Sequence, residues 1–540
     1  MIRRARTIPL ATLLLAAASF PACGDDESSA AGAGGASSSS SNSSSSSSNS
    51  GGAGGAGGAG GAGGAGGAGG CDVACDAVQG TAIDRWVGET ATVDVAADLS
   101  AATVEALVPM GNGQWSTIGG EGNADGSFTI QDVPTGAYVL HFVGGALPSY
   151  VYTSARDIDL GTEFAGRVDA VAPTVSPTDL VTSVTNLEAW QGADTIEWFV
   201  GNNNAWMTLQ FAGPAATNPP ADGAIALDAL TLDWSAAFGG ALIDNDKGDV
   251  LTLIQLSTRM GTGNIAYQVA TRFVSFDDIV QTDGAPVQRS GAFTEVPQDQ
   301  SVALDLRPTQ FADLIPDANP TATDQGFASV IITLPGAGMY GPFGNSADLL
   351  SVDLGIGAAD VDLGTVTYGN PYPAAWGASL FTINNFRVAY TAPGATTPAN
   401  RFGSFVAVSD PATAGGGPIQ PTMSPVQDLQ VNGMSAFSDL SGVTETPTVS
   451  WSAPAIGTPT YYFASVLELI NNGGATQAVP VANLYTKGTE VALPPGILAS
   501  GKSYYLRVRA AAAPIDIETQ PLRKAGTQVW ADALTNMITP

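Results

Sequence analysis

The feature that most constrains folding is a stretch of 47 residues, Gly24 to Gly70, built almost entirely of Ser, Gly and Ala. Such side chains bury too little apolar surface to offset the conformational entropy of an ordered chain. We therefore expect a disordered tether over residues 23–70, with a root-mean-square reach on the order of 40 Å. The rest of the chain is long enough for two to four domains of roughly 100–200 residues each.

A short apolar segment precedes the tether. Three arginines lead into an apolar run at residues 8–20, which ends just before Cys23. The run is too short to cross a bilayer, which takes about 20 residues, and its basic flank is typical of a signal peptide. This order resembles that of bacterial lipoprotein precursors. The resemblance implies a signal peptide at residues 1–22 and lipid on Cys23. Plain secretion after cleavage at Ala18 or Ser19 is the alternative.

Cysteine usage agrees with this interpretation. The chain has three cysteines, and an odd number in an exported protein calls for an explanation. Lipid on Cys23 leaves one pair, Cys71 and Cys75, whose short "CDVAC" spacing permits a local disulfide. A zinc site at this pair is disfavoured, because structural zinc needs four ligands and the chain has a single histidine.

The residue after Cys23 indicates whether a lipidated protein would stay in the inner membrane or move to the outer membrane. In enterobacterial lipoproteins, Asp directly after the lipidated cysteine keeps the protein in the inner membrane, whereas Gly24 follows here. By this resemblance we expect the lipid to hold the protein in the outer membrane. The long Ser- and Gly-rich tether suits display at the cell surface.

Charge and composition limit the fold class and the partners. The chain carries 49 acidic and 19 basic residues, a net charge of −30, so it repels nucleic acids and anionic headgroups. DNA and RNA are therefore not expected as partners. Many glycines and prolines, together with few charged residues, favour turn-rich β-structure over helices. We predict an all-β fold of tandem β-sandwich domains after the disordered tether.

The first predicted domain covers residues 71–167. In "NADGSFTIQDVPTGAYVLHF", Asp125 and Gly126 make a tight turn, and the alternation that follows is typical of half-buried strands. The motifs "DG-x-F" and "P-x-G-x-Y" resemble those of the carboxypeptidase regulatory-like, or transthyretin-like, β-sandwich family. The resemblance implies a seven-stranded sandwich that serves as a spacer or binding module without catalysis.

The last predicted domain covers residues 418–540. The strand-like segments "PTVSWSAP", "TYYFASVLEL" and "GILASGKSYYLRVRA" include a buried Trp451. Leu498 and Tyr504 resemble the tyrosine corner, in which a tyrosine hydroxyl bonds back to the preceding loop. The pattern resembles that of fibronectin type III domains.

Residues 173–417 lie between these two domains and resemble no family. Strand-like runs alternate with Gly-, Pro- and Asn-containing turns, and only "TQFADLI" predicts a short helix. A large β-sandwich is the favoured interpretation, and a propeller or two smaller sandwiches are the alternatives. The lack of a regular repeat of about 40–50 residues counts against a propeller.

One acidic cluster is a weak candidate for calcium. Asp244, Asp246 and Asp249 fall in "DNDKGD", and carboxylate oxygens are ligands that calcium prefers. The EF-hand pattern is absent, so a solvated turn is the favoured interpretation. Structural calcium is the one cofactor that we consider.

Two strings mimic nucleotide-binding motifs. "GILASGKS", at residues 496–503, fits the P-loop pattern, but a strand-like run follows where that motif needs a helix. "GAGMYG", at residues 336–341, is followed by Pro342, which opposes the helix that a dinucleotide site needs. His141, the single histidine, is expected to be structural. We therefore predict that the protein is not an enzyme.

The tryptophans of the middle segment are the last candidates. Trp190, Trp198, Trp206 and Trp234 are expected in the core, although an exposed subset could stack on sugar rings. The favoured function is a non-catalytic, lipid-anchored envelope protein that presents β-sandwich modules for adhesion or for binding a polymer or protein. The alternatives are a carbohydrate-binding lipoprotein, with a glycan as its ligand, and a secreted hydrolase with a catalytic middle domain.

Overall fold

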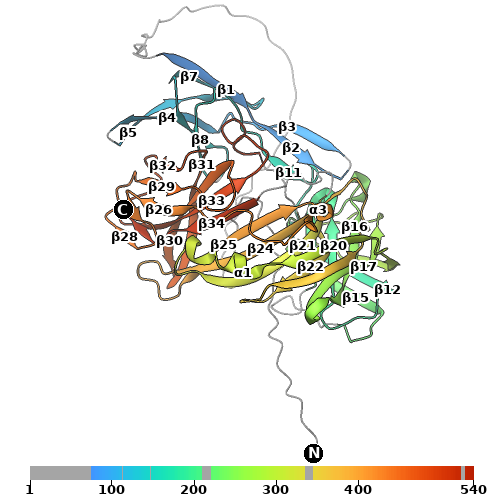
Figure 1. Cartoon of the computed structure of the whole chain (residues 1–540). Coiled ribbons are helices and arrows are strands. Elements are labelled where there is room, and N and C mark those ends of the chain that lie inside the picture. The colour runs from blue at the N-terminus through green and yellow to red at the C-terminus, as the bar shows by residue number, and fades with distance from the viewer. Residues whose placement is uncertain are drawn as a thin grey trace, which may run out of the picture.

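The computed structural model describes residues 74–540, except for residues 90, 112, 146, 210–219, 335–344 and 524–528. The predicted signal peptide and tether lie outside the described residues. The described part consists of β-strands with a few short helices, which confirms the predicted all-β class (Figure 1). Within it, no helix is both long and apolar enough to span a bilayer. The strands form four consecutive groups, which we call modules I to IV.

Module I, at residues 75–165, is a sandwich around one hydrophobic cluster. The sheets β10-β1-β7-β6 and β5-β4-β8-β9 contribute the cluster, and β11-β2-β3 forms a third, smaller sheet. Phe128, Ile130, Tyr138 and Leu140 are buried, as the alternation in the sequence predicts. The strands are β1 (Cys75–Thr81), β2 (Ile83–Val87), β3 (Thr92–Ala96), β4 (Thr103–Gly111), β5 (Gln114–Gly119), β6 (Glu121–Gly122), β7 (Ser127–Pro134), β8 (Tyr138–Val143), β9 (Ser149–Thr153), β10 (Asp157–Asp159) and β11 (Glu163–Ala165).

Module II, at residues 179–295, packs the sheet β15-β12-β18 against β13, β14, β16 and β17. A separate hydrophobic cluster, rich in tryptophan, fills the space between them. The strands are β12 (Asp179–Thr185), β13 (Thr195–Val200), β14 (Ala205–Thr208), β15 (Ala226–Asp233), β16 (Leu251–Met260), β17 (Ala266–Phe276), β18 (Val287–Ala292) and β19 (Thr294–Glu295). The 3-10 turns are η1 (Gly201–Asn203), η2 (Trp234–Ala236), η3 (Asn245–Lys247) and η4 (Thr262–Asn264).

Module III, at residues 300–414, contains the antiparallel sheet β22-β21-β24-β25 and the pair β20-β23. Two short helices lie where "TQFADLI" predicts one, because Pro308 starts the first and a second begins at Ile315. The elements are β20 (Gln300–Leu306), α1 (Pro308–Ala312), α2 (Ile315–Ala318), β21 (Thr323–Leu334), β22 (Ala347–Leu354), β23 (Val361–Tyr368), β24 (Gly377–Tyr390), β25 (Ala399–Ser409) and α3 (Pro411–Ala414).

Module IV, at residues 427–539, pairs the sheet β27-β26-β29-β32 with a second one formed by β31, β30, β33 and β34. Trp451 is buried, as expected. The strands are β26 (Gln427–Val431), β27 (Met434–Ser435), β28 (Leu440–Ser441), β29 (Thr448–Ser452), β30 (Tyr461–Asn472), β31 (Ala475–Thr486), β32 (Glu490–Ala492), β33 (Ser503–Ala512), β34 (Val529–Leu534) and β35 (Ile538–Thr539).

One hydrogen-bonded ladder runs through all four modules. Strand β17 of module II pairs with β22 of module III, and β25 of module III pairs with β34 of module IV. Strand β31 of module IV then pairs in parallel with β9 of module I. The modules are therefore joined edge to edge by backbone hydrogen bonds, in addition to the chain that links them.

The hydrophobic cores cross the boundaries that the sequence suggested. Residues 173–417 contain a tryptophan-rich cluster within module II, and they also contribute to a larger cluster that continues through module III into module IV. The large core therefore joins the predicted middle and C-terminal domains. The division of the chain into domains stays a prediction.

Candidate functional site

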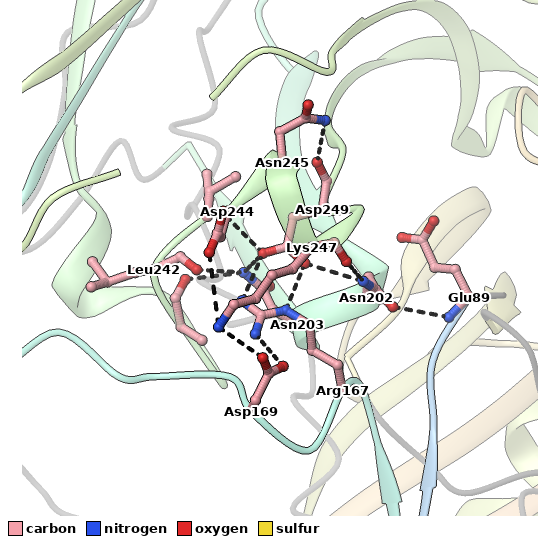
Figure 2. A network of polar contacts seen from close by, with 12 residues as sticks. Glu89, Arg167, Asp169, Asn202, Asn203, Leu242, Asp244, Asn245, Lys247 and Asp249 are labelled. Atoms are coloured by element: carbon pink, nitrogen blue, oxygen red, sulfur yellow. Dashed lines mark hydrogen bonds and ion pairs between the residues drawn. The ribbon is translucent and has the colours of Figure 1, made fainter. Parts of the chain in front are cut away.

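The loop that holds the weak calcium candidates Asp244, Asp246 and Asp249 forms a polar network at the junction of modules I and II (Figure 2). The Asp249 side chain is fully buried, and its carboxylate lies 2.9 Å and 3.1 Å from Nε and Nη2 of Arg167. It also accepts a hydrogen bond of 2.8 Å from the backbone N–H of Asp244. Gly248 provides the turn with its positive φ of 85°, which favours glycine.

The three aspartates of this loop do not converge as calcium ligands. Asp249 points inward to a guanidinium, whereas Asp246 is exposed. Within the described ranges, no three His, Cys, Asp or Glu side chains form a group that could hold a metal ion. Calcium is the weaker of the two interpretations of this loop, and the oxygens of Asp249 are paired with Arg167 instead. The favoured interpretation, a solvated turn, fits Asp246 but not Asp249, which is buried.

The same network anchors module I to module II. Arg167 follows β11, and it also pairs with Asp169 at 2.6 Å, while Lys247 lies 2.7 Å from the second oxygen of Asp169. These two cations lower the pKa of Asp169 to about 2, with the hydrogen bond from Lys247 as the larger cause. Asn202 donates to Asp249 at 3.2 Å and accepts from the backbone N–H of Glu89 at 3.3 Å.

A second group of acids lies beside this network, and we call it the acidic junction. It consists of Glu197 from β13 and Asp348 from β22, so modules II and III contribute to it, whereas Glu89, from the turn between β2 and β3, lies apart with its backbone N–H on Asn202. The carboxylate of Glu197 accepts a hydrogen bond of 3.1 Å from the backbone N–H of Asp348. Burial, and then the charges of Glu197, Glu89 and Asp348, raise the pKa of the Tyr372 hydroxyl.

Burial favours the neutral form of these carboxyl groups and of Glu89. Burial raises the pKa of Glu89 from 4.5 to about 7, although hydrogen bonds from the backbone oppose the shift. Burial also raises the pKa of Glu197, and both burial and the charge of Glu197 raise the pKa of Asp348. Two neighbouring buried carboxyl groups disfavour ionisation of both at once.

Aromatic rings from the same strands and the loop after β23 pack together. Tyr372 stacks on Trp376 with ring centroids 4.9 Å apart, and Phe199 meets both rings edge-on. The indole N–H of Trp206 and the hydroxyl of Tyr372 are buried without a hydrogen-bond partner of normal geometry. Trp206 nevertheless lies close enough to lower the pKa of Glu197 against the larger effect of burial.

The four tryptophans of the middle segment are all core residues. Trp190, Trp198, Trp206 and Trp234 are between 0% and 4% exposed. The prediction that they pack in the core is confirmed, and the idea that an exposed subset forms a platform for sugars is wrong for these four.

The strings that mimic nucleotide sites have structural roles where the structure describes them. Strand β33 begins at Ser503, so no helix follows "GILASGKS", and Lys502 pairs with Glu468 at 2.9 Å. "GAGMYG" lies outside the described residues. The ring of His141 stacks on Tyr150 and lies 3.1 Å from a carboxylate oxygen of Glu105, on the face of β8 opposite to Leu140.

The tyrosine corner expected in the last domain is present. The hydroxyl of Tyr504 accepts a hydrogen bond of 3.0 Å from the backbone N–H of Ala499, and Leu498 beside it is buried. This contact closes the loop before β33 onto the sandwich of module IV.

The predicted lipid and disulfide residues are only partly described. Cys75 is disulfide-bonded. Cys71, its predicted partner, and Cys23, the predicted lipid site, lie outside the described residues. Both assignments stay predictions.

The sequence interpretation did not find the acidic junction. A signal was present, because Glu197 is the one charged residue in the strand-like run "TIEWFV", in which residues 196–200 are all buried. An acid within such a run marks a buried carboxyl group that needs a special environment. Glu89 and Asp348 carry no comparable local signal.

The comparisons with known proteins do not assign a function to this site. No family model matches the chain, and no curated protein matches it. Among solved structures, the chain is similar to the FN1–FN3 domains of chicken CNTN1, with 12% identity and a TM-score of 0.11 over 85% of this chain and 99% of that one.

Proposed function

We propose that this protein is a non-catalytic, lipid-anchored protein of the bacterial envelope, which presents its β-sandwich modules as one body for binding. The observation that supports the proposal most is the hydrogen-bonded ladder through all four modules. It fixes the modules relative to one another. A surface that is already ordered loses less conformational entropy when it binds a partner, so such a body suits binding.

The N-terminal sequence supports the anchor. A signal peptide, a lipid on Cys23 and a Ser- and Gly-rich tether would hold the body at a distance from the outer membrane, with the surface of the cell as its place of display. The net charge of −30 disfavours nucleic acids as partners. We propose a protein or an uncharged polymer, such as a glycan, as the ligand.

The finer assignments of the modules belong to the same proposal. The tyrosine corner of module IV supports a fibronectin type III-like sandwich. The two hairpin motifs and the buried alternation of module I support a carboxypeptidase regulatory-like sandwich. Both families serve as spacers or binding modules.

The acidic junction favours binding over hydrolysis as well. Carboxyl groups with raised pKa values are common at catalytic sites. However, Glu197 is only 2% exposed, which leaves a polymer substrate little access to it. The buried tryptophans equally weaken a carbohydrate-binding function that depends on them.

Expression of the full chain in a Gram-negative host, beside a Cys23→Ala variant, tests the anchor. We expect the full chain in the membrane fraction and accessible to antibody on intact cells, and the variant in the soluble fraction. Equal distribution of both would contradict the lipid anchor. The same preparation on glycan and envelope-polymer arrays tests binding, and turnover of a polysaccharide or peptide that Glu197→Gln abolishes would favour a hydrolase instead.

A further inference from the structure

Strand β3 forms an edge of module I, as the outer strand of the small sheet β11-β2-β3 (Figure 1). Among the described residues it pairs only with β2, over five consecutive residue pairs without a bulge. All of its residues, Thr92–Ala96, are exposed, and within the same described ranges their backbone makes no hydrogen bond beyond β2. Native sheets commonly protect such an edge with lysine, proline or a bulge, and β3 has none of these three.

The backbone groups of β3 that face outward follow from its pairing. The N–H of Ala97, just past the strand, donates at 2.9 Å to the carbonyl of Ala82, just before β2. Inward and outward groups alternate along an antiparallel strand. Thr92, Asp94 and Ala96 therefore direct their N–H and carbonyl groups away from β2, and these groups are the donors and acceptors that a further strand needs.

One face of this sheet carries an apolar row that reaches the edge. In register, Phe164 of β11 lies beside Trp86 of β2, and Trp86 lies opposite Val93 of β3. The rings of Phe164 and Trp86 stack with their centroids 4.6 Å apart. Val93 and Val95 share this face and are 43% and 37% exposed. A strand added at this edge would place its own apolar residues against the two valines.

The opposite face carries a charged row that ends at the same edge. The guanidinium of Arg85, on β2, lies 3.7 Å from the carboxylate of Glu163 and 3.0 Å from that of Asp94. The order across the sheet is therefore acid, base, acid, and a base fits the next position. The Asp94 side chain is 48% exposed, so a side chain from an added strand can reach its carboxylate. Opposite charges directly across a strand pair stabilise that pair.

A second copy of this chain fits the edge poorly. If β3 paired with itself in an antiparallel arrangement over its whole length, the two Asp94 carboxylates would lie directly opposite each other. Like charges in that position destabilise a strand pair, and the net charge of −30 adds repulsion between copies. Asp94 therefore disfavours self-association and favours a basic partner.

We propose that β3 binds an extended segment of a basic protein by strand addition, with a lysine or arginine opposite Asp94 between two apolar residues that face Val93 and Val95. The inference rests on the proposed binding function and names a partner for it, but it does not depend on the lipid anchor. Backbone hydrogen bonds to Thr92, Asp94 and Ala96 supply affinity. The alternation of apolar and basic side chains supplies selectivity.

Binding of two blocked peptides to the purified full chain tests the proposal. One has the sequence Ser-Thr-Val-Lys-Val-Thr-Ser, and the other has aspartate in place of lysine. In calorimetric titrations we expect the lysine peptide to bind at least about tenfold more tightly, because the aspartate replaces an attraction by a repulsion. Hydrogen–deuterium exchange with the lysine peptide should show a gain in protection at residues 92–96.

Three variants locate the binding. Ala96→Pro removes an outward N–H but keeps the hydrogen bonds to β2, so it should weaken binding at least about tenfold. Asp94→Lys should reverse the preference, so that the aspartate peptide binds more tightly. Asp278→Lys is the matched control and should leave the preference unchanged. Asp278 also pairs with a surface arginine, at 2.8 Å, and it is 69% exposed, but it lies in module II.

Equal affinities of the two peptides for the unaltered chain would overturn the proposal, and so would binding that survives Ala96→Pro unchanged. If Ala96→Pro fails to fold, the preference of Asp94→Lys still decides. Self-association of the unaltered chain in sedimentation, lost in Ala96→Pro, would show that a second copy occupies the edge instead. Binding of neither peptide, beside a ligand found on the glycan and envelope-polymer arrays, would overturn the strand addition but not the proposed binding function.

Discussion

The guanidinium of Arg523 lies 2.7 Å from the carboxylate of Asp159, although the two residues are 364 positions apart in the chain. The same guanidinium donates to the backbone carbonyl of Ile83 at 2.9 Å. Only 9% of the Arg523 side chain is exposed. This contact holds module I against the C-terminal part of the chain, beside the pairing of β9 with β31.

Removing this contact should loosen module I. Arg523→Met keeps much of the side-chain bulk but leaves Asp159 without its cation, and we expect a loss of about 1.5–3 kcal/mol in the free energy of unfolding. Urea denaturation of the full chain measures it. Lys487→Met is the control, because its pair with Asp516 is exposed and should contribute less than about 1 kcal/mol. Equal losses in the two variants would show that the buried pair stabilises the fold no more than the exposed pair does.

Removal of the unpaired hydroxyl of Tyr372 should not destabilise the protein. Tyr372→Phe removes a buried polar group that has no partner among the described residues, so we expect stability to stay constant or to rise by about 1 kcal/mol. Tyr390→Phe is the matched control, because its hydroxyl donates to the carbonyl of Thr535 at 2.6 Å. That variant should lose about 1–2 kcal/mol in thermal or urea unfolding. A loss of the same size in Tyr372→Phe would show that its hydroxyl does have a partner.

Removal of the tyrosine corner should lower the stability of module IV. Tyr504→Phe leaves the backbone N–H of Ala499 without its acceptor, and we expect a loss of about 1–2 kcal/mol. Tyr267→Phe, at a partly buried tyrosine of module II, should change stability by less than about 0.5 kcal/mol. Urea denaturation measures the free energy of unfolding of both variants. Equal values would show that the tyrosine corner does not stabilise module IV.

Crowding at Gly88 gives a steric prediction. Gly88→Ala places a Cβ atom against Asn202 and should destabilise the docked turn by about 1–3 kcal/mol. Gly119→Ala, on β5, meets nothing within 4 Å and serves as the control. Thermal unfolding of the two variants measures the difference. A Gly88→Ala protein as stable as the control would show that the turn is not packed against module II.

Local features of the fold could be predicted because their physics is local. Asp125 and Gly126 make the expected turn, in which the Asp125 carboxylate accepts from the backbone of Ser127 and Gly126 has a φ of 80°. Tyr504 forms its corner because the bond spans only five residues. In each case the residues that matter lie within a few positions of one another.

The contacts between modules could not be predicted. The pairing of β31 with β9 joins Leu484 to Tyr150, and a strand edge carries no sequence signal for a partner so far away. The burial of Asp249 could not be predicted for the same reason. The segment "DNDKGD" is typical of a solvated turn, and only the fold places Arg167 beside it. Long-range neighbours decide whether an acid is a surface charge, an ion pair or a buried neutral group.

Mass spectrometry of the N-terminal peptide, from full-length protein extracted from membranes, tests the central claim most directly. The account predicts a peptide that begins at Cys23 and carries acyl chains on it. A soluble protein whose first peptide is unprocessed and begins at Met1 would contradict the proposal that this body of β-sandwich modules is anchored in the bacterial envelope.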